Sequence, residues 1–375
     1  MKPLREFLSF ELARLQAEGL ERRLLFPGGI DFSSNDYLGV ARAPSVRERL
    51  AQRVREGPDG APASRLLRGN LPIHAMLEER LASFKGTEAA LLFPTGYQAN
   101  LGLLTSLIRP EDRAISDELN HASIIDGLRL AGCHRAIVPH LDLEAIRAEL
   151  ARPHPSGRTF IVTESLFSMD GDIAPLDRYA ELAETYGASL IVDDAHATGV
   201  YGDARGSGLT EAFGVEARCE AIVSTCGKAL GFLGAFVAGP RVLVDWLVNR
   251  ARPFIFTTAP PPAMVHGIDC ALDYISERPE LRKRTLALAD DLRRRLHARG
   301  IDTLRSEGPI VPVVIGDNER AIDISLAVQA HGYDVRAIRP PSVAPGTARL
   351  RVSVHADHRE VDIDGVAEAI IASLA

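Results

Sequence analysis

The chain has 375 residues, of which 46% are hydrophobic and 25% charged, a composition that is typical of globular proteins and argues against disorder. Its net charge of −7 is mild and no basic block stands out, so neither nucleic acid nor an anionic membrane is an expected partner. A chain of this length exceeds one simple core, which predicts a large domain together with a smaller one.

The first fifteen residues mix charged and apolar side chains at helical spacing, which predicts an amphipathic helix rather than a signal peptide. No apolar run in the chain reaches the length of a membrane span. The four cysteines lie far apart and show no zinc-binding spacing, so we expect reduced thiols and a cytoplasmic protein.

The next part of the chain predicts an α/β fold. Residues 57–69 read as a long loop, and residues 73–84 as a helix that stops at Gly86. Apolar strands separated by helices then indicate a mostly parallel seven-stranded sheet, covered on both faces. The predicted strands are residues 90–93, 114–116, 136–138, 159–163, 189–192, 221–224 and 235–238.

A second, smaller set of elements follows a proline-rich crossing at residues 253–262. Residues 263–299 predict a long helix that Pro279 can break, and residues 310–315 begin further strands and helices. Residues 348–354 alternate in a way that predicts a half-buried strand with Arg349 and Arg351 on one face. The predicted domains are an N-terminal helix and linker over residues 1–35, a large domain over 36–265 and a smaller α/β domain over 266–375.

Lys228 is a candidate catalytic residue because it follows the buried run 221–223 within a stretch of small residues. Ligands of parallel sheets bind beyond the carboxyl ends of the strands, where this lysine is expected. Burial lowers the pKa of a lysine, and a neutral amine can condense with an aldehyde such as pyridoxal phosphate. A solvated lysine at a strand end is the alternative.

Asp193 and His196 follow the buried run 190–192. A carboxylate at the tip of a buried strand needs a cation or hydrogen-bond donors, and a protonated pyridine nitrogen would serve. A metal site is the competing interpretation, since two aspartates and a histidine are reasonable ligands. We expect no metal, because no second histidine cluster lies at ligand spacing and Lys228 would be an odd neighbour for a cation.

Other polar residues follow the remaining strands. Gly96 and Tyr97 open a helix whose free backbone N–H groups could hold a phosphate, although a tight turn explains Gly96 equally well. His121 follows the second strand, where its ring could stack on an aromatic cofactor or be merely structural. Glu164 and Ser168 lie on the same predicted rim, and helix capping is their alternative role.

Stretches along nearly the whole chain resemble the α-oxoamine synthases, which are pyridoxal-phosphate enzymes of the aspartate-aminotransferase fold. These stretches are residues 33–39, 117–123, 163–172, 192–199 and 225–228. Residues 337–343 and 346–351 most resemble the member of the family that acts in biotin biosynthesis. The resemblance implies a sheet of the aspartate-aminotransferase type and a homodimer with active sites at the interface.

The resemblance also implies roles for individual residues. Lys228 would form the Schiff base with pyridoxal phosphate, and Asp193 would pair with the pyridine nitrogen. His196 would bond the phenolic oxygen, and His121 would stack on the ring. Further cofactor contacts are implied for Gly96, Tyr97, Glu164, Ser168 and Thr225, and for Thr257 and Thr258 toward a neighbouring subunit. Substrate contacts are implied for Arg22, Asn35, His121, Ser342 and Arg351.

The implied reaction is a decarboxylative condensation of L-alanine with an acyl thioester, expected to be pimeloyl-CoA or a pimeloyl-carrier protein. One alternative is another synthase of the family, for instance one that joins glycine to acetyl-CoA. A catalytically silent binding subunit is a remote alternative, because such subunits typically lack the lysine. The loop at residues 60–70 and Ser342 depart from the family's pattern, which leaves the acyl chain and its carrier open.

Overall fold

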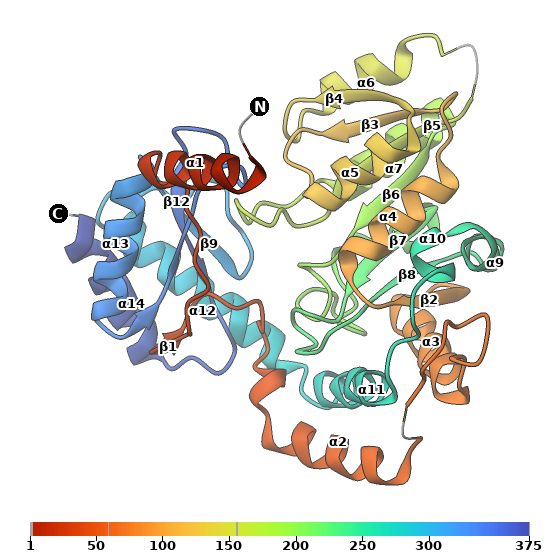
Figure 1. Ribbon diagram of the computed structural model, residues 1–375, viewed down its shortest axis with the longest axis horizontal. Coiled ribbons are helices and arrows are strands. Elements are labelled where there is room, and N and C mark those ends of the chain that lie inside the picture. Colours follow the sequence, from red (N-terminus) through yellow and green to blue (C-terminus); the bar gives the residue numbers. More distant parts are fainter. Residues whose placement is uncertain (1–2, 59, 155–156, 375) are drawn as a thin grey trace. The chain divides into compact units, whose positions relative to one another are not determined.

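The computed structural model describes residues 3–58, 60–154 and 157–374 (Figure 1). The chain forms two compact units. The larger unit takes Asn35–Ser168 and Ile173–Arg284, and the smaller one takes Met1–Ser34, Met169–Asp172 and Thr285–Ala375. The domain limits expected after residues 35 and 265 stay predictions.

The larger unit is built on a seven-stranded sheet with the strand order β2-β8-β7-β6-β5-β3-β4. Neighbouring strands pair in parallel from β7 through β6, β5 and β3 to β4, whereas β8 runs antiparallel to both β7 and β2. The mostly parallel sheet expected from the sequence is therefore confirmed. The strands are β2 (Ala89–Phe93), β3 (Arg113–Asp117), β4 (His134–Val138), β5 (Thr159–Glu164), β6 (Ser189–Asp193), β7 (Ala221–Thr225) and β8 (Ala235–Gly239).

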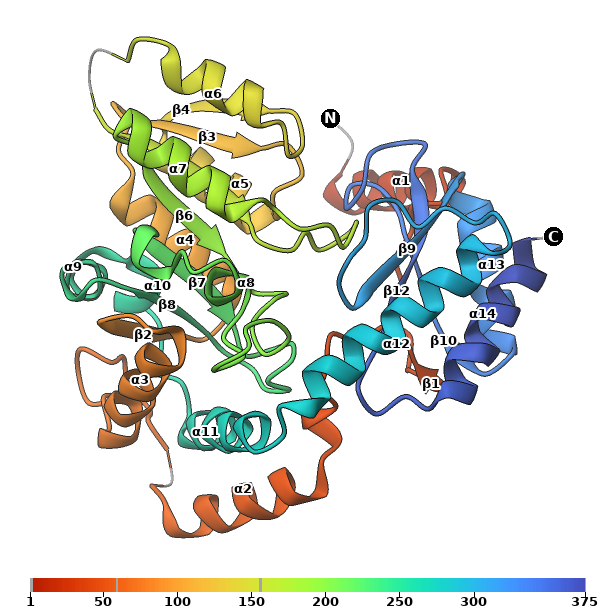
Figure 2. The ribbon, with the colours of Figure 1, turned by 180° about the vertical axis from the view of Figure 1, so that it is seen from behind.

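Helices cover both faces of this sheet because successive side chains of each strand point to opposite faces. Phe160 and Val162 pack in one apolar cluster with α4 and α5, while Ile161 between them packs in the other with α6 and α7. Figure 1 shows α4 and α5 on the near face, and Figure 2 shows α6 and α7 from behind. These helices are α4 (Gly96–Leu107), α5 (Ala122–Ala131), α6 (Leu143–Ala151) and α7 (Leu176–Tyr186).

The other helices of the larger unit include the expected helix at residues 73–84, which is α3 and ends at Gly86 in the left-handed conformation. The break expected near Pro279 is also confirmed, since α11 ends at Ser276 and α12 begins at Glu280. The elements are η1 (Val40–Arg42), α2 (Pro44–Glu56), α3 (Pro72–Lys85), α8 (Leu209–Ala212), η2 (Glu216–Arg218), α9 (Arg241–Arg250), α10 (Arg252–Ile255), α11 (Pro262–Ser276) and α12 (Glu280–His297), the last of which continues into the smaller unit.

The smaller unit contains a three-stranded antiparallel sheet of order β11-β12-β9 and a parallel pair formed by β1 and β10. Its elements are α1 (Leu4–Ala17), β1 (Ile30–Asp31), β9 (Ile310–Gly316), α13 (Asn318–Ala330), β10 (Tyr333–Asp334), β11 (Arg336–Ile338), β12 (Ala348–Ser353) and α14 (Glu360–Leu374). Across the described ranges, no helix has the length and apolar character needed to traverse a membrane.

The prediction of a half-buried strand at residues 348–354 is wrong, because every residue of β12 is buried. The charged side chains on its polar face have partners within the same unit. Arg349 forms an ion pair with Asp170 and donates to the Thr347 carbonyl at 3.0 Å, while Arg351 donates to Ser353 Oγ at 2.9 Å. A guanidinium can be buried when such acceptors surround it.

Candidate active site

A cavity of about 190 Å³ lies at the carboxyl ends of β5, β6 and β7 in the larger unit. Strand register explains this, because β5 and β6 pair Glu164 with Asp193, and β6 and β7 pair Asp193 with Val223. The cavity brings together eight of the residues singled out from the sequence. They are Gly96, Tyr97, His121, Glu164, Asp193, His196, Thr225 and Lys228.

Asp193 is 8% exposed, and both of its carboxylate oxygens accept hydrogen bonds. Oδ2 accepts from Asn100 Nδ2 at 2.7 Å and Oδ1 accepts from the Ala195 backbone N–H at 3.0 Å. Such donors favour the charged form of a carboxyl group. Sequence reasoning missed Asn100, although it stands four residues after Gly96 and therefore on the same face of α4.

The N-terminus of α4 borders the cavity through Gly96 and Tyr97. Thr95 caps the helix, with Oγ1 accepting from the Gln98 backbone N–H at 3.2 Å. The Tyr97 hydroxyl donates to Asp126 on α5. Unpaired N–H groups in a first helical turn, together with the helix dipole, suit the binding of an anion.

His121 caps α5, and its imidazole is held in one orientation by Ser123. The Ser123 backbone N–H donates to Nδ1 at 3.2 Å, so Nδ1 is unprotonated and the proton of the neutral ring is on Nε2. Burial lowers the pKa of His121; Asp193 opposes this effect, and Lys228 adds to it. His121 therefore presents a neutral ring to the cavity.

His196 is oriented by Tyr37, a residue that sequence reasoning did not assign to the site. The Tyr37 side chain is fully buried, and its hydroxyl lies 2.8 Å from His196 Nδ1. The same hydroxyl donates to Asn35 Oδ1 at 3.1 Å. The signal for Tyr37 was a single aromatic residue within the polar run 33–39, and it links the predicted substrate contact Asn35 to the cavity.

Several predicted site residues lie outside this cavity. Ser168 is buried but does not line it. Thr257 and Thr258 line a separate, mostly apolar hollow of about 820 Å³ in the larger unit. Arg22, Ser342 and Arg351 belong to the smaller unit, and their roles stay predictions.

A buried lysine other than Lys228 belongs to what we name the Asp194 cluster, which consists of Asp194, Lys85, Ser165, Thr198 and Thr210. Lys85 is 0% exposed, and its Nζ lies 2.7 Å from Asp194 Oδ2 and 3.1 Å from Thr198 Oγ1. Ser165 Oγ and Thr210 Oγ1 also donate to Asp194, at 2.6 and 3.0 Å. Sequence reasoning missed Lys85, which lies at the end of a helix far from Asp194 in the chain.

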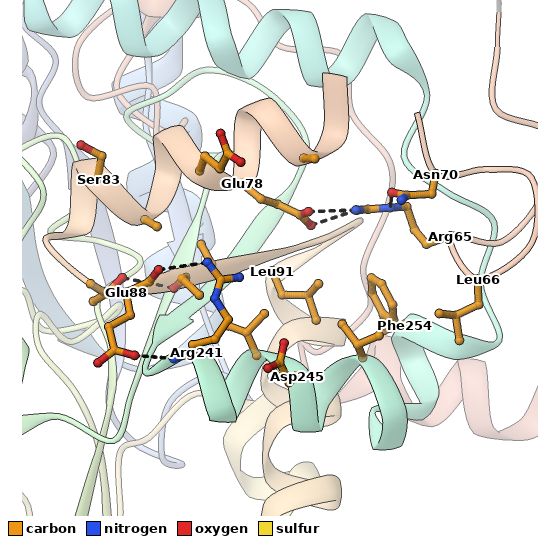
Figure 3. A pocket seen from close by; sticks show the side chains of 18 residues that line it. Arg65, Leu66, Asn70, Glu78, Ser83, Glu88, Leu91, Arg241, Asp245 and Phe254 are labelled. Atoms are coloured by element: carbon orange, nitrogen blue, oxygen red, sulfur yellow. Dashed lines mark hydrogen bonds and ion pairs between the residues drawn. The ribbon is translucent and has the colours of Figure 1, made fainter. Parts of the chain in front are cut away.

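Another hollow of the larger unit, about 470 Å³ in volume, lies beside the edge strand β2 (Figure 3). Two of its charged side chains form an ion pair, as Figure 3 shows for Arg65 with Glu78 at 2.9 and 2.8 Å. Glu78 also accepts from the Leu92 backbone N–H at 2.9 Å and so satisfies a donor of the edge strand. These contacts give Arg65 and Glu78 a structural role at the edge of the sheet.

No three histidine, cysteine, aspartate or glutamate side chains of the described residues are arranged to hold a metal ion. All four cysteines are free thiols and buried. Burial raises the pKa of Cys219 to about 12 and that of Cys226 well above its ordinary value. Cys226 therefore offers no thiolate to the cavity, although it is two residues from Lys228.

Comparisons with known proteins agree with this architecture. The family model for class I and II aminotransferases matches residues 27–370. An 8-amino-7-oxononanoate synthase from Anaeromyxobacter dehalogenans is 44% identical over 98% of this chain and 96% of its own. A variant of SPT solved with PLP aligns with a TM-score of 0.90 at 30% identity, covering 99% and 98% of the two chains. A solved 8-amino-7-oxononanoate synthase from Francisella tularensis aligns with a TM-score of 0.79 at 26% identity, covering 92% and 98%.

Proposed function

Because this chain belongs to the class I and II aminotransferase family and, within it, to the α-oxoamine synthases, we propose that it condenses L-alanine with a pimeloyl thioester. The products are 8-amino-7-oxononanoate, carbon dioxide and free thiol, in a step of biotin biosynthesis. The observation that carries the proposal is the similarity to 8-amino-7-oxononanoate synthases along nearly the full length of the chain. The acyl donor is pimeloyl-CoA or a pimeloyl-carrier protein.

Pyridoxal phosphate is the cofactor of this family, and the donor set of the cavity fits it. The Asp193 carboxylate, held by two donors, suits a protonated ring nitrogen. The amine of Lys228 suits an aldehyde, and the N-terminus of α4 suits a phosphate. When bound, the cofactor supplies a sink for the electrons that are released at the Cα atom of the amino acid.

The residues around the cavity then divide the proton transfers among them. The Lys228 amine accepts the proton that leaves Cα of the amino acid. Asp193 holds a proton at the ring nitrogen. The neutral His121 imidazole provides a flat surface against the ring, and His196, oriented by Tyr37, donates a proton to the acyl carbonyl oxygen.

Arg351 and Asn35 bind the carboxylate of the amino acid in this proposal. Two arginines on β12 were candidates, and the resemblance to the family favours Arg351. The acyl substrate is assigned to Arg22 and Ser342. Two hydrogen bonds within the smaller unit join the segment that carries Arg22 to the segment that leads to Ser342, which supports a shared role. Arg22 donates to the Pro340 carbonyl at 3.1 Å, and Arg339 donates to the Glu21 carbonyl at 3.2 Å.

We further propose a cytoplasmic homodimer, in which Thr257 and Thr258 contact the cofactor phosphate of the partner subunit. The apolar lining of the hollow that holds these threonines supports an interface there. Leu233 and Phe256 are large apolar side chains that are exposed in the single chain, at 61% and 71%. Such exposure is typical of a surface that a second copy covers.

The experiment that tests the function is a substrate panel with purified protein reconstituted with pyridoxal phosphate. L-alanine with pimeloyl-CoA or pimeloyl-carrier protein should release carbon dioxide and free thiol, whereas glycine with acetyl-CoA should not. A preference for glycine with acetyl-CoA would reassign the protein as a 2-amino-3-oxobutyrate CoA ligase. Absence of turnover with every pair would favour the silent binding subunit and overturn the proposal.

A further inference from the structure

The carboxyl group of Glu164 has no defined chemical role in the reaction above. Glu164 ends β5, is 3% exposed and lines the cavity. Its Oε1 atom is buried and has no hydrogen-bond partner among the described residues. A charged carboxylate buried with an unsatisfied oxygen carries a large desolvation cost, which protonation removes.

The neighbours of Glu164 also favour its neutral form. Asp193 is its register partner on β6, and both Asp193 oxygens accept hydrogen bonds. The charge of Asp193 raises the pKa of Glu164. Two adjacent carboxyl groups do not readily ionise together. Asp117, at the end of β3, adds a further negative charge.

Two groups act in the opposite direction. Lys228 provides a positive charge, and the backbone N–H of His121 donates toward the Glu164 carboxyl. The His121 ring is itself neutral and adds no charge. Burial is the largest effect and Asp193 the next, so together the surroundings raise the pKa of Glu164 well above its ordinary value.

We propose that Glu164 is protonated at neutral pH and donates a hydrogen bond from its neutral carboxyl group to an oxygen atom of the molecule held in the cavity, beside an ionised Asp193. A neutral carboxyl can serve an electron-rich oxygen that a second carboxylate would repel. The identity of the acceptor, an oxygen of the cofactor or of the amino acid, rests on the proposed function. The protonation of Glu164 does not.

Two substitutions of Glu164 test whether its side chain acts as a neutral hydrogen-bond donor or as a charged group. Glu164→Gln keeps the size of the side chain and an N–H donor, so turnover should fall only about threefold. Glu164→Leu removes the donor, and turnover should fall about 10- to 100-fold. In wild type, turnover should decline at alkaline pH as Glu164 ionises, and Glu164→Gln should lack this decline. A Gln variant as impaired as the Leu variant would contradict the proposal.

The deciding measurement needs no turnover. An infrared difference spectrum of the full-length holoenzyme, wild type minus Glu164→Gln at neutral pH, should contain the C=O band of a protonated carboxyl group that shifts in heavy water. A carboxylate band in its place would overturn the proposal. Circular dichroism of both proteins checks the fold. The spectrum does not depend on the acyl donor. The prediction that Glu164 is protonated can therefore fail while the substrate panel supports the proposed function, and the reverse.

Discussion

Asp193 and Asp194 are consecutive residues at the end of β6, and their carboxylates have opposite surroundings. In the Asp194 cluster, the carboxylate faces Lys85 and accepts from Ser165 and Thr210. Asp193 faces the cavity beside Glu164, whose Oε1 has no partner among the described residues. The contrast teaches that a buried carboxylate paired with a buried lysine serves stability, whereas a carboxylate that lines a cavity is available to a ligand.

The largest expected effect comes from removing the amine of the cavity. Lys228→Ala should lower turnover by about 10⁴-fold, because the general base is lost. Its melting temperature should stay close to that of wild type. In wild type, borohydride should fix the cofactor to Lys228 and not to the buried Lys85, as mass spectrometry of peptides can check. A colourless wild-type protein that pyridoxal phosphate cannot reconstitute would refute the assignment.

The stabilising role of the Asp194 cluster is tested by Lys85→Met. This change leaves the Asp194 carboxylate buried without its cation and should lower the free energy of unfolding by about 3–5 kcal/mol. Denaturant unfolding measures the loss, and the exposed Lys283→Met is the matched control. Turnover per bound cofactor should change little in the protein that remains folded. A loss of turnover with unchanged stability would show that the Asp194 cluster belongs to the active site.

His358 in the smaller unit is another buried group with filled partners. Its Nδ1 accepts from the His355 backbone N–H at 3.0 Å, and its Nε2 lies 2.8 Å from the Asp31 carbonyl. Burial, with the charge of His355 second, lowers the pKa of His358 from 6.5 to about 4. Between these values the unfolded chain binds more protons, so stability should fall as the pH drops from 6.5 to 4, by roughly 3 kcal/mol.

The measurement for His358 is denaturant unfolding across that pH range. His358→Gln should flatten the decline, because the titrating group is gone. The exposed His134→Gln should leave the slope unchanged. An identical slope in wild type and His358→Gln would contradict the assignment.

The smallest expected effect comes from removing the side-chain donor to Asp193. Asn100→Ala removes the donor to Oδ2 and should lower turnover about 10- to 100-fold. Ser123→Ala removes the other partner of Asn100 and the hydroxyl 2.7 Å from His121 Nδ1. It keeps the bond to Asp193 and the backbone N–H that donates to His121, so its effect should be smaller. Affinity for the cofactor, measured by absorbance titration, should fall with Asn100→Ala. Equal effects of the two changes would mean that the bond to Asp193 is unimportant.

The sheet and the edge that carries the cavity could be predicted because the pattern that encodes them is local. Each strand is a short apolar run, and each chemically active side chain follows a run within a few residues. The carboxyl ends of parallel strands meet at one edge of a sheet, so Glu164, Asp193 and Lys228 were expected to converge. The cavity that they line agrees with that expectation.

Side chains whose partners are distant in the chain could not be assigned in this way. Tyr37 reaches His196 across 159 positions, and Lys85 reaches Asp194 across 109. The half-buried interpretation of β12 failed for the same reason, since the partner of Arg349 lies 179 positions away. An alternating pattern records which residues share a face, and it contains no information about what covers that face.

The sequence by itself determined the order of the strands along the chain, the identity of the candidate lysine, aspartate and histidines, and the family that they resemble. The tertiary structure decided which lysine is buried against Asp194 and which of two adjacent aspartates lines a cavity. It also decided that Glu164 has an oxygen without a partner among the described residues. The physical reason is that burial and hydrogen-bond partners, which set the charge of a group, come from contacts that form only when distant segments pack together.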